Sequence, residues 1–263
     1  MARKTTYAII LASVSLLLLR WLTMSTQQSS QGSSPYDEAE FLGLITEIYQ
    51  VLLRLGHIKP DRMVWAPPTG HDINLSVLEN PNGIDERVVS LMRKLPAGPH
   101  ACVDPYMRPV IFLNDGELMR SRDIDKRASG LDYRAHIDQS NALPTVLLLW
   151  TGFESTDPVL VLDVADNTVR YFDEVYNGPH YLNYPAEHAP TYLKHVLENY
   201  RDGIWVPDND AGVFETDKRE PSWGPELRRT LVEDYKWPGE GFRQDAWRND
   251  VHTIIGRLME LDE

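Results

Sequence analysis

The sequence predicts an α+β fold in which a small, mostly antiparallel sheet is packed by N- and C-terminal helices. Three observations support this fold class. Apolar residues recur at helical spacing near both ends of the chain, short apolar runs bounded by Pro or Gly occupy the middle, and one tight-turn sequence joins two such runs. Helices and strands therefore come in blocks, which favours α+β over a doubly wound sheet.

The first predicted helix begins after Ser34-Pro35 and ends at Gly56. Acidic Asp37 and Glu38 fall in its first turn, where negative charge interacts favourably with the helix dipole. Its apolar positions share one face: Phe41, Leu44, Ile45, Ile48, Leu52 and Leu55. A second amphipathic helix is predicted over Asp85–Leu95.

The middle of the chain switches to strand-like runs. Val110–Leu113 and Val146–Trp150 are short apolar segments that predict buried strands. Val159–Val164 and Val169–Phe172 predict a hairpin, because the intervening Ala165–Thr168 contains Asp and Asn, which tolerate the positive φ of tight turns.

Helical spacing returns in the C-terminal third. A helix is predicted over Ala189–Tyr200, with Pro190 near its start. An acidic loop is expected at 207–220, followed by helices near Glu226–Tyr235 and Gln244–Leu261. Together these elements predict one globular domain over residues 35–263.

The charge balance of this domain is acidic. Residues 25–263 hold 23 Lys and Arg against 39 Asp and Glu, a net charge of −16. Such a domain repels phosphate backbones, which argues against a nucleic-acid partner. The single cysteine, Cys102, excludes an intramolecular disulfide and a multi-cysteine zinc site.

Residues 1–24 form a hydrophobic signal-anchor or signal peptide. Arg3 and Lys4 precede the uncharged run Tyr7–Leu19, and residues 5–24 reach the length of a membrane span if Arg20 lies at the far boundary. The excess of positive charge before the run places the N-terminus in the cytoplasm and the domain in the lumen or outside the cell. We favour this single-pass anchor, and residues 25–34 then form a polar linker.

Two alternatives stay open for this N-terminus. Cleavage near Thr23-x-Ser25 would give a secreted protein, although no clean Ala-x-Ala site is present. Translation starting at Met24 would give a cytosolic one. Asn74-Leu-Ser76 is the single glycosylation sequon, and it supports a lumenal location only weakly.

The short motifs that could carry out chemistry occur no more often than chance predicts. Asp123-Ile-Asp125 and Asp208-Asn-Asp210 resemble the metal-binding pair of a glycosyltransferase, but 22 Asp in 263 residues produce about two such pairs by chance. Cys102 beside His100 is more simply a buried structural thiol. Turn capping explains Asp163 and Asp173-Glu174 better than acid–base work does. The clustered histidines are likewise better explained as exposed or core residues than as metal ligands: His180, His188 and His195. We therefore expect no catalytic residue, metal or cofactor.

Aromatic residues near carboxylates give the clearest sign of a binding surface. The candidate interaction surface comprises Tyr171, Tyr176, Tyr181, Tyr184 and Trp205. Core packing is the competing explanation for at least half of these side chains.

Residues 144–206 resemble the C-terminal half of SUKH-superfamily domains. The resemblance is carried by Val146–Trp150, Pro158–Val164, Asn167–Phe172 and the Pro-led helix containing Tyr192–Leu197. The family's Gly-rich N-terminal segment has no clear counterpart here. The whole chain also resembles filamentous-fungal proteins in style.

The SUKH resemblance implies an α+β domain that binds other proteins and has no active site. The expected function is a non-catalytic protein-interaction domain with an unidentified protein partner, tethered to a membrane where residues 5–24 act as the anchor. The alternative is a single-pass membrane-anchored enzyme, such as a small glycosyltransferase or hydrolase that uses the Asp pairs.

Overall fold

The computed structural model describes residues 34–78, 83–97, 102–115, 143–152, 158–172, 182, 184–208, 212–218 and 222–260. From Pro35 onward these residues belong to one folded unit. The predicted membrane-directed segment, the polar linker up to residue 33 and three of the four aspartates in the Asp pairs lie outside the described residues. Within the described residues, no helix is both long enough and apolar enough to cross a bilayer.

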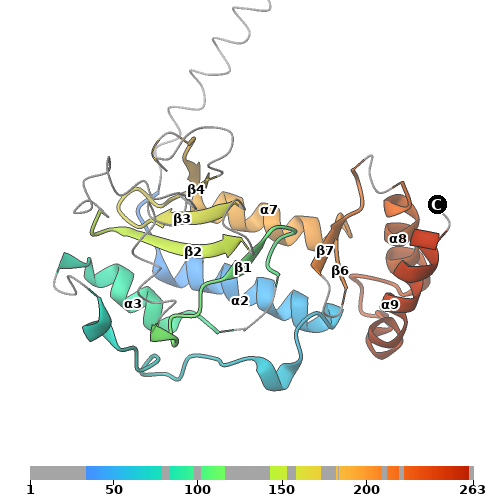
Figure 1. Ribbon diagram of the computed structural model, residues 1–263, viewed down its shortest axis with the longest axis horizontal. Helices are drawn as coiled ribbons and strands as arrows, with labels where there is room; N and C mark the ends of the chain where they lie inside the picture. Colours follow the sequence, from blue (N-terminus) through green and yellow to red (C-terminus); the bar gives the residue numbers. More distant parts are fainter. Residues whose placement is uncertain are drawn as a thin grey trace, which may run out of the picture. The chain divides into compact units, whose positions relative to one another are not determined.

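A five-stranded antiparallel sheet forms the centre of the unit and confirms the predicted α+β class (Figure 1). Its strands follow chain order: β1 (Met107–Pro109), β2 (Val146–Gly152), β3 (Val159–Asp163), β4 (Thr168–Phe172) and β5 (Glu187–His188). Every residue of β2 and β3 is buried, so both faces of these two strands are covered.

The hairpin of β3 and β4 is confirmed together with its turn. Val159 pairs with Phe172 at one end and Asp163 with Thr168 at the other. Asn167 has a φ of 54°, the left-handed conformation that Asn tolerates, and the Asp163 carboxylate accepts a hydrogen bond from the Ala165 amide at 2.9 Å. Asp163 therefore caps the turn.

Helices α2 (Glu38–Leu55) and α7 (Ala189–Arg201) pack against each other beside the sheet, and α3 (Glu86–Lys94) contacts α2 (Figure 1). Asp37 caps the start of α2 by accepting hydrogen bonds from two backbone amides, so the helix begins three residues later than Pro35. Gly56 ends it with a φ of 83°. All six residues of the predicted apolar face of α2 are buried.

The C-terminal helices gather beside a second, two-stranded sheet made of β6 (Trp205–Asp208) and β7 (Gly212–Glu215) (Figure 1). These helices are α8 (Gly224–Arg229), the π-helical turn Thr230–Asp234 and α9 (Gln244–Glu260). Helix α9 contacts both α2 and β6, and its Trp247 is fully buried. This packing joins the C-terminal helices to the first helix of the domain.

Two strand predictions differ from the structure. The predicted strand at Val110–Leu113 is wrong in position, because β1 pairs with the end of β2 and the chain then turns, with the Asn114 amide bonded to the Ile111 carbonyl. The predicted acidic loop at 207–220 is partly wrong, since its first half completes the β6–β7 hairpin.

Candidate functional site

Aromatic and acidic side chains from the segment before β1 and from β4, α7, β6 and β7 define what we call the acidic–aromatic face. The face comprises Asp104, Tyr106, Tyr171, Tyr192, Trp205 and Glu215. The Tyr106 hydroxyl donates to the Glu215 carboxylate at 2.8 Å, and Glu215 lies opposite Trp205 in the β6–β7 pair. Burial raises the pKa of Tyr192, and negative charge on Asp104, Tyr171 and Glu187 adds to the shift, so Tyr192 lies within electrostatic range of these residues.

Two of the aromatic rings in the acidic–aromatic face are open to solvent. Tyr106 is 48% exposed and Tyr171 is 37% exposed. Tyr192 is partly buried and packs against Trp150 with ring centroids 6.1 Å apart. The face therefore combines two exposed aromatic rings with a third, Tyr192, that packs against the buried Trp150.

Asp104 is the buried carboxyl group at the centre of this face. Only 3% of the residue is exposed, and its carboxylate accepts a hydrogen bond from the Tyr106 amide at 2.7 Å. Burial, with a smaller contribution from the nearby Glu215, raises the pKa of Asp104 from 3.8 to about 7 against the opposing effect of the Tyr106 and Met107 amides. Asp104 therefore titrates near neutral pH.

A buried histidine fixes the segment that carries Asp104. The His57 Nε2 accepts a hydrogen bond from the Cys102 amide at 2.9 Å, so the assigned tautomer places the proton on Nδ1. That Nδ1 donates to the Asp208 carbonyl at 2.8 Å. One imidazole thus links the chain before β1 to the end of β6, a role that no local pattern around His57 predicts.

The predicted aromatic surface is only partly assembled. Tyr171 lies in the acidic–aromatic face at the surface, and half-buried Trp205 packs edge-on against Tyr200. Tyr184 is 5% exposed and packs against Phe172, with ring centroids 4.7 Å apart. Tyr176 and Tyr181 lie outside the described residues.

The other candidate residues from the sequence that the structure describes occupy positions typical of structural residues. Asp208 is buried in β6, where its carboxylate pairs with His252 at 3.0 Å. Cys102 is also buried, which raises the pKa of its thiol to about 11 and favours the unreactive protonated form. His188 lies at the start of α7 and bonds to Thr191. His195 is exposed, and His100, His180 and Asp173-Glu174 lie outside the described residues.

The predicted glycosylation residue lies at the surface. Asn74 is exposed and precedes the short 3₁₀ helix Leu75–Val77. Its amide nitrogen donates to the Asp115 carboxylate at 3.1 Å, and its oxygen accepts from Ser76 at 2.6 Å. The side-chain amide of Asn74 has two N–H groups, and a glycan would replace one of them. The other N–H could still donate to Asp115.

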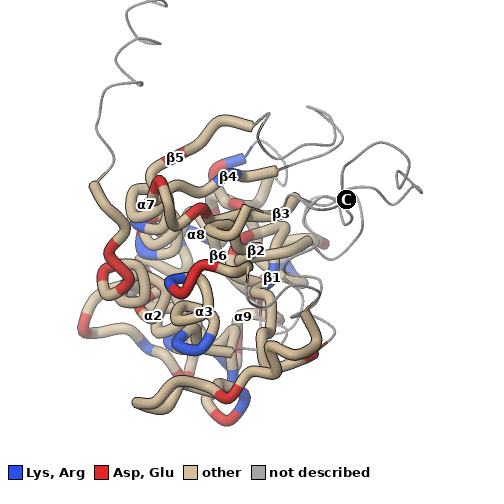
Figure 2. Tube along the Cα trace, turned by 90° about the vertical axis from the view of Figure 1, so that its left-hand side faces the viewer, with Lys and Arg blue, Asp and Glu red and all other residues tan. Residues whose placement is uncertain are grey.

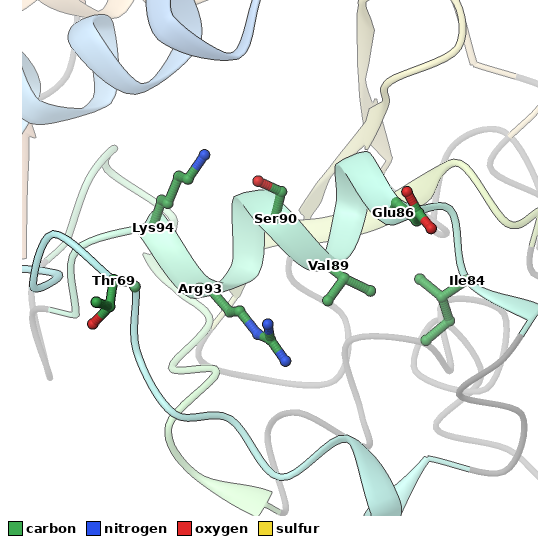
Figure 3. Close-up of a pocket in the computed structure, with 8 residues that line it drawn as sticks. Thr69, Ile84, Glu86, Val89, Ser90, Arg93 and Lys94 are labelled. Atoms are coloured by element: carbon green, nitrogen blue, oxygen red, sulfur yellow. The ribbon is translucent and has the colours of Figure 1, made fainter.

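A second feature is a groove of about 520 Å³ along α3, which we call the α3 groove (Figure 3). It is lined by Thr69, Gly70, Ile84, Glu86, Val89, Ser90, Arg93 and Lys94. The α3 groove and the acidic–aromatic face are formed by different elements. Helix α3, which lines the groove, lies far from β7, which carries Glu215 of the face (Figure 1).

No protein-family model, curated protein or solved structure matches this chain. Function is therefore inferred from the residues of the folded unit and their geometry. The resemblance of residues 144–206 to SUKH-superfamily domains stays a hypothesis.

Proposed function

We propose that residues 35–263 form a non-catalytic protein-interaction domain that binds its partner through the acidic–aromatic face. The observation that supports this proposal most directly is the hydrogen bond between exposed Tyr106 and Glu215, beside the buried Asp104. Tyrosine supplies large, rigid contact area at low entropic cost and a hydroxyl that tolerates a wet interface. A ring already oriented by its hydroxyl loses less freedom on binding.

The proposed partner is a basic protein surface. The domain carries a net charge of −16 outside the first 24 residues, and acidic residues are spread over its trace (Figure 2). Such a field speeds the approach of a positively charged partner. At the face itself, an arginine of the partner can stack on the Tyr106 ring and replace exposed Lys218, which lies 3.6 Å from the Glu215 carboxylate, as the partner of that acid, a combination that Arg makes better than Lys.

The proposal includes a membrane tether through residues 5–24, with the domain in the lumen or outside the cell. The charge asymmetry around the apolar run supports this orientation. Secreted and cytosolic forms are the alternatives. A SUKH-like domain that binds proteins without an active site is compatible with this function and remains part of the proposal.

The experiment compares partner capture by three forms of the full-length chain. The face variant carries Tyr106→Ser, Tyr171→Ser and Glu215→Gln. The control variant carries three matched changes at exposed positions on the C-terminal segments: Val232→Ser, Glu240→Gln and Met259→Ser. Captured proteins are identified by mass spectrometry, and circular dichroism checks that the variants are folded.

We expect a basic protein to be captured by the wild type and the control variant and lost from the face variant. Its affinity should fall as salt is raised, because each exposed ion pair is screened. Equal capture by all three forms would show that the acidic–aromatic face is not the binding surface. Recovery of no specific partner would contradict the interaction function itself.

A further inference from the structure

The α3 groove has a cationic end, an apolar middle and an anionic end. Figure 3 shows Arg93 and Val89 extending from the same side of α3, with Ile84 beyond Val89 and Glu86 at the opposite end of the helix from Arg93. Arg93 and Glu86 are exposed, while Val89 and Ile84 are half-buried. The groove therefore offers two charges of opposite sign separated by apolar surface.

Two of the polar side chains that line the groove already have partners. Ser90 and Lys94 point away from Arg93 (Figure 3), and both bond to the carboxylate of Glu38 on α2. Among the described residues, by contrast, neither the Arg93 guanidinium nor the Glu86 carboxylate has an ion-pair partner. Of the charged residues that line the groove, Arg93 and Glu86 are therefore the two available to a ligand.

The wall of the groove beside Arg93 is held by the backbone. The His71 amide donates to the Arg93 carbonyl at 2.7 Å. Gly70 has a φ of 80°, and a Cβ added there would lie 3.0 Å from the Arg93 Cβ. Glycine therefore lets the chain approach Arg93 closely, and the cationic end of the groove is fixed in place.

The spacing of the two charges suits an extended peptide. Seven residues separate Glu86 from Arg93, which is about 10 Å along a helix axis at ~1.5 Å per residue. A peptide extended in the polyproline II conformation covers about the same length in three residues at ~3.1 Å each, and its three residues per turn bring positions i and i+3 to the same side. A volume of about 520 Å³ falls in the range of sites that hold a ligand or a short segment.

We propose that the α3 groove binds an extended peptide segment of another protein, with an acidic and a basic residue three positions apart and aliphatic residues between them. The acidic residue pairs with Arg93 and the basic residue with Glu86, while the aliphatic side chains cover Ile84 and Val89. Charge complementarity at both ends selects this occupant. The site lies apart from the acidic–aromatic face and does not rest on the function proposed for that face.

The test measures fluorescence anisotropy of labelled hexapeptides titrated with the full-length chain. The probes are Gly-Asp-Leu-Leu-Lys-Gly and its reverse, because the groove does not fix the direction of the peptide. The neutral control is Gly-Asn-Leu-Leu-Gln-Gly. We expect one charged peptide to bind at least about fivefold more tightly than the neutral one, the size of one or two partly exposed ion pairs.

Matched variants separate local pairing from overall charge. Arg93→Gln should weaken the favoured peptide about fivefold, whereas Arg257→Gln, which removes an exposed arginine on α9, should change its affinity less than twofold. Glu86→Gln and Glu240→Gln form the corresponding acidic pair. Because Arg93 and Glu86 also favour the dipole of α3, unfolding is measured for each variant so that lost stability is not mistaken for lost binding.

A reversed charge keeps the proposal testable even if loss-of-binding variants are unstable. Arg93→Glu should bind Gly-Lys-Leu-Leu-Lys-Gly at least about fivefold more tightly than the wild type does. The face variant should bind the favoured peptide unchanged. The proposal is overturned if neither charged peptide exceeds the neutral one, if Arg93→Gln and Arg257→Gln act alike, or if the reversed pair fails. A dimer that Arg93→Gln abolishes would assign the groove to a second copy of the chain and would also overturn it.

Discussion

Replacing Asp104 with Asn tests the buried carboxyl beneath the acidic–aromatic face. The substitution keeps the shape and an oxygen that can accept the Tyr106 amide, but it removes the titrating proton. The groups that face this carboxyl are Cys102 in the same segment, Glu215 on β7, and Tyr192 and Tyr200 on α7. None of them is a cation, so the ionised form of Asp104 has no ion-pair partner among these neighbours.

The sign of the effect follows from the raised pKa. Between the unfolded value of 3.8 and the folded value of about 7, the folded state binds the proton more tightly, so this group stabilises the protein at low pH and loses that contribution as pH rises. At ~1.36 kcal/mol per pKa unit, the free energy of unfolding contributed by Asp104 falls by about 2.5 kcal/mol between about pH 4.5 and about pH 6.5.

Urea denaturation of the full-length chain at several pH values measures this contribution. The free energy of unfolding of Asp104→Asn, minus that of the wild type, should rise by about 2.5 kcal/mol over the same interval, because all other titrations cancel in the difference. Asp245→Asn, at an exposed position on α9, replaces a carboxyl group by the same amide and serves as the control. A difference that stays constant with pH would refute the assigned ionisation of Asp104.

Three further predictions concern the folded unit. His57→Phe should lower the free energy of unfolding by about 2–4 kcal/mol in urea denaturation, because two buried backbone groups lose their partner, whereas a change under 1 kcal/mol would contradict the role of this histidine as a link. Gly56→Ala should lower the free energy of unfolding by more than about 1 kcal/mol, because its φ is 83° and the new Cβ would meet the Arg248 side chain. Gly43→Ala is the control: it lies within a helix with open space around it and should raise the free energy of unfolding by about 0.5–1 kcal/mol. Equal effects of the two substitutions would refute this account. Cys102 should react with a thiol reagent at pH 7.5 only after unfolding, because it is buried and its pKa is about 11, and rapid labelling of the folded chain would contradict that assignment.

Local sequence signals were enough to predict the long elements. The apolar period of α2 extends over five turns and ends at Gly56, whose left-handed conformation is the one expected after a helix. The β3–β4 hairpin was predictable because its turn chemistry and its apolar runs agree. In both cases the residues that determine the element are neighbours in the sequence.

The shorter strands depend on partners that the sequence does not place. β1 is an edge strand of three residues. The apolar residues after it, Val110 and Phe112, are buried although the chain turns there, so their sequence looks like that of a strand. In β6, Pro207 and Asp208 disfavour a strand by propensity, yet Asp208 is buried because His57 and His252 supply its hydrogen bonds. Tertiary contacts therefore overrode local preference at both places.

The candidate site was predictable only in part for the same reason. Aromatic residues close together in the sequence drew attention to Tyr171 and Trp205, both of which lie in the acidic–aromatic face. Tyr106 and Glu215 are 109 residues apart, so their hydrogen bond left no local pattern. A buried Asp followed by a tight turn, as at Asp104, looks in the sequence like any other turn residue.

Under the proposed function, the position of Asp104 would give stability and partner binding opposite dependences on pH. As pH rises through about 7, Asp104 ionises, and its charge is added beneath Tyr106 and beside Glu215. That charge costs stability because it is buried without a cation, yet it increases the attraction of the acidic–aromatic face for a basic partner. A bound arginine would supply the missing cation and lower the pKa of Asp104 again, so binding of the partner should release a proton near neutral pH. This coupling requires Asp104 itself, and Asp104→Asn should abolish the proton release while leaving the exposed Tyr106 ring in place.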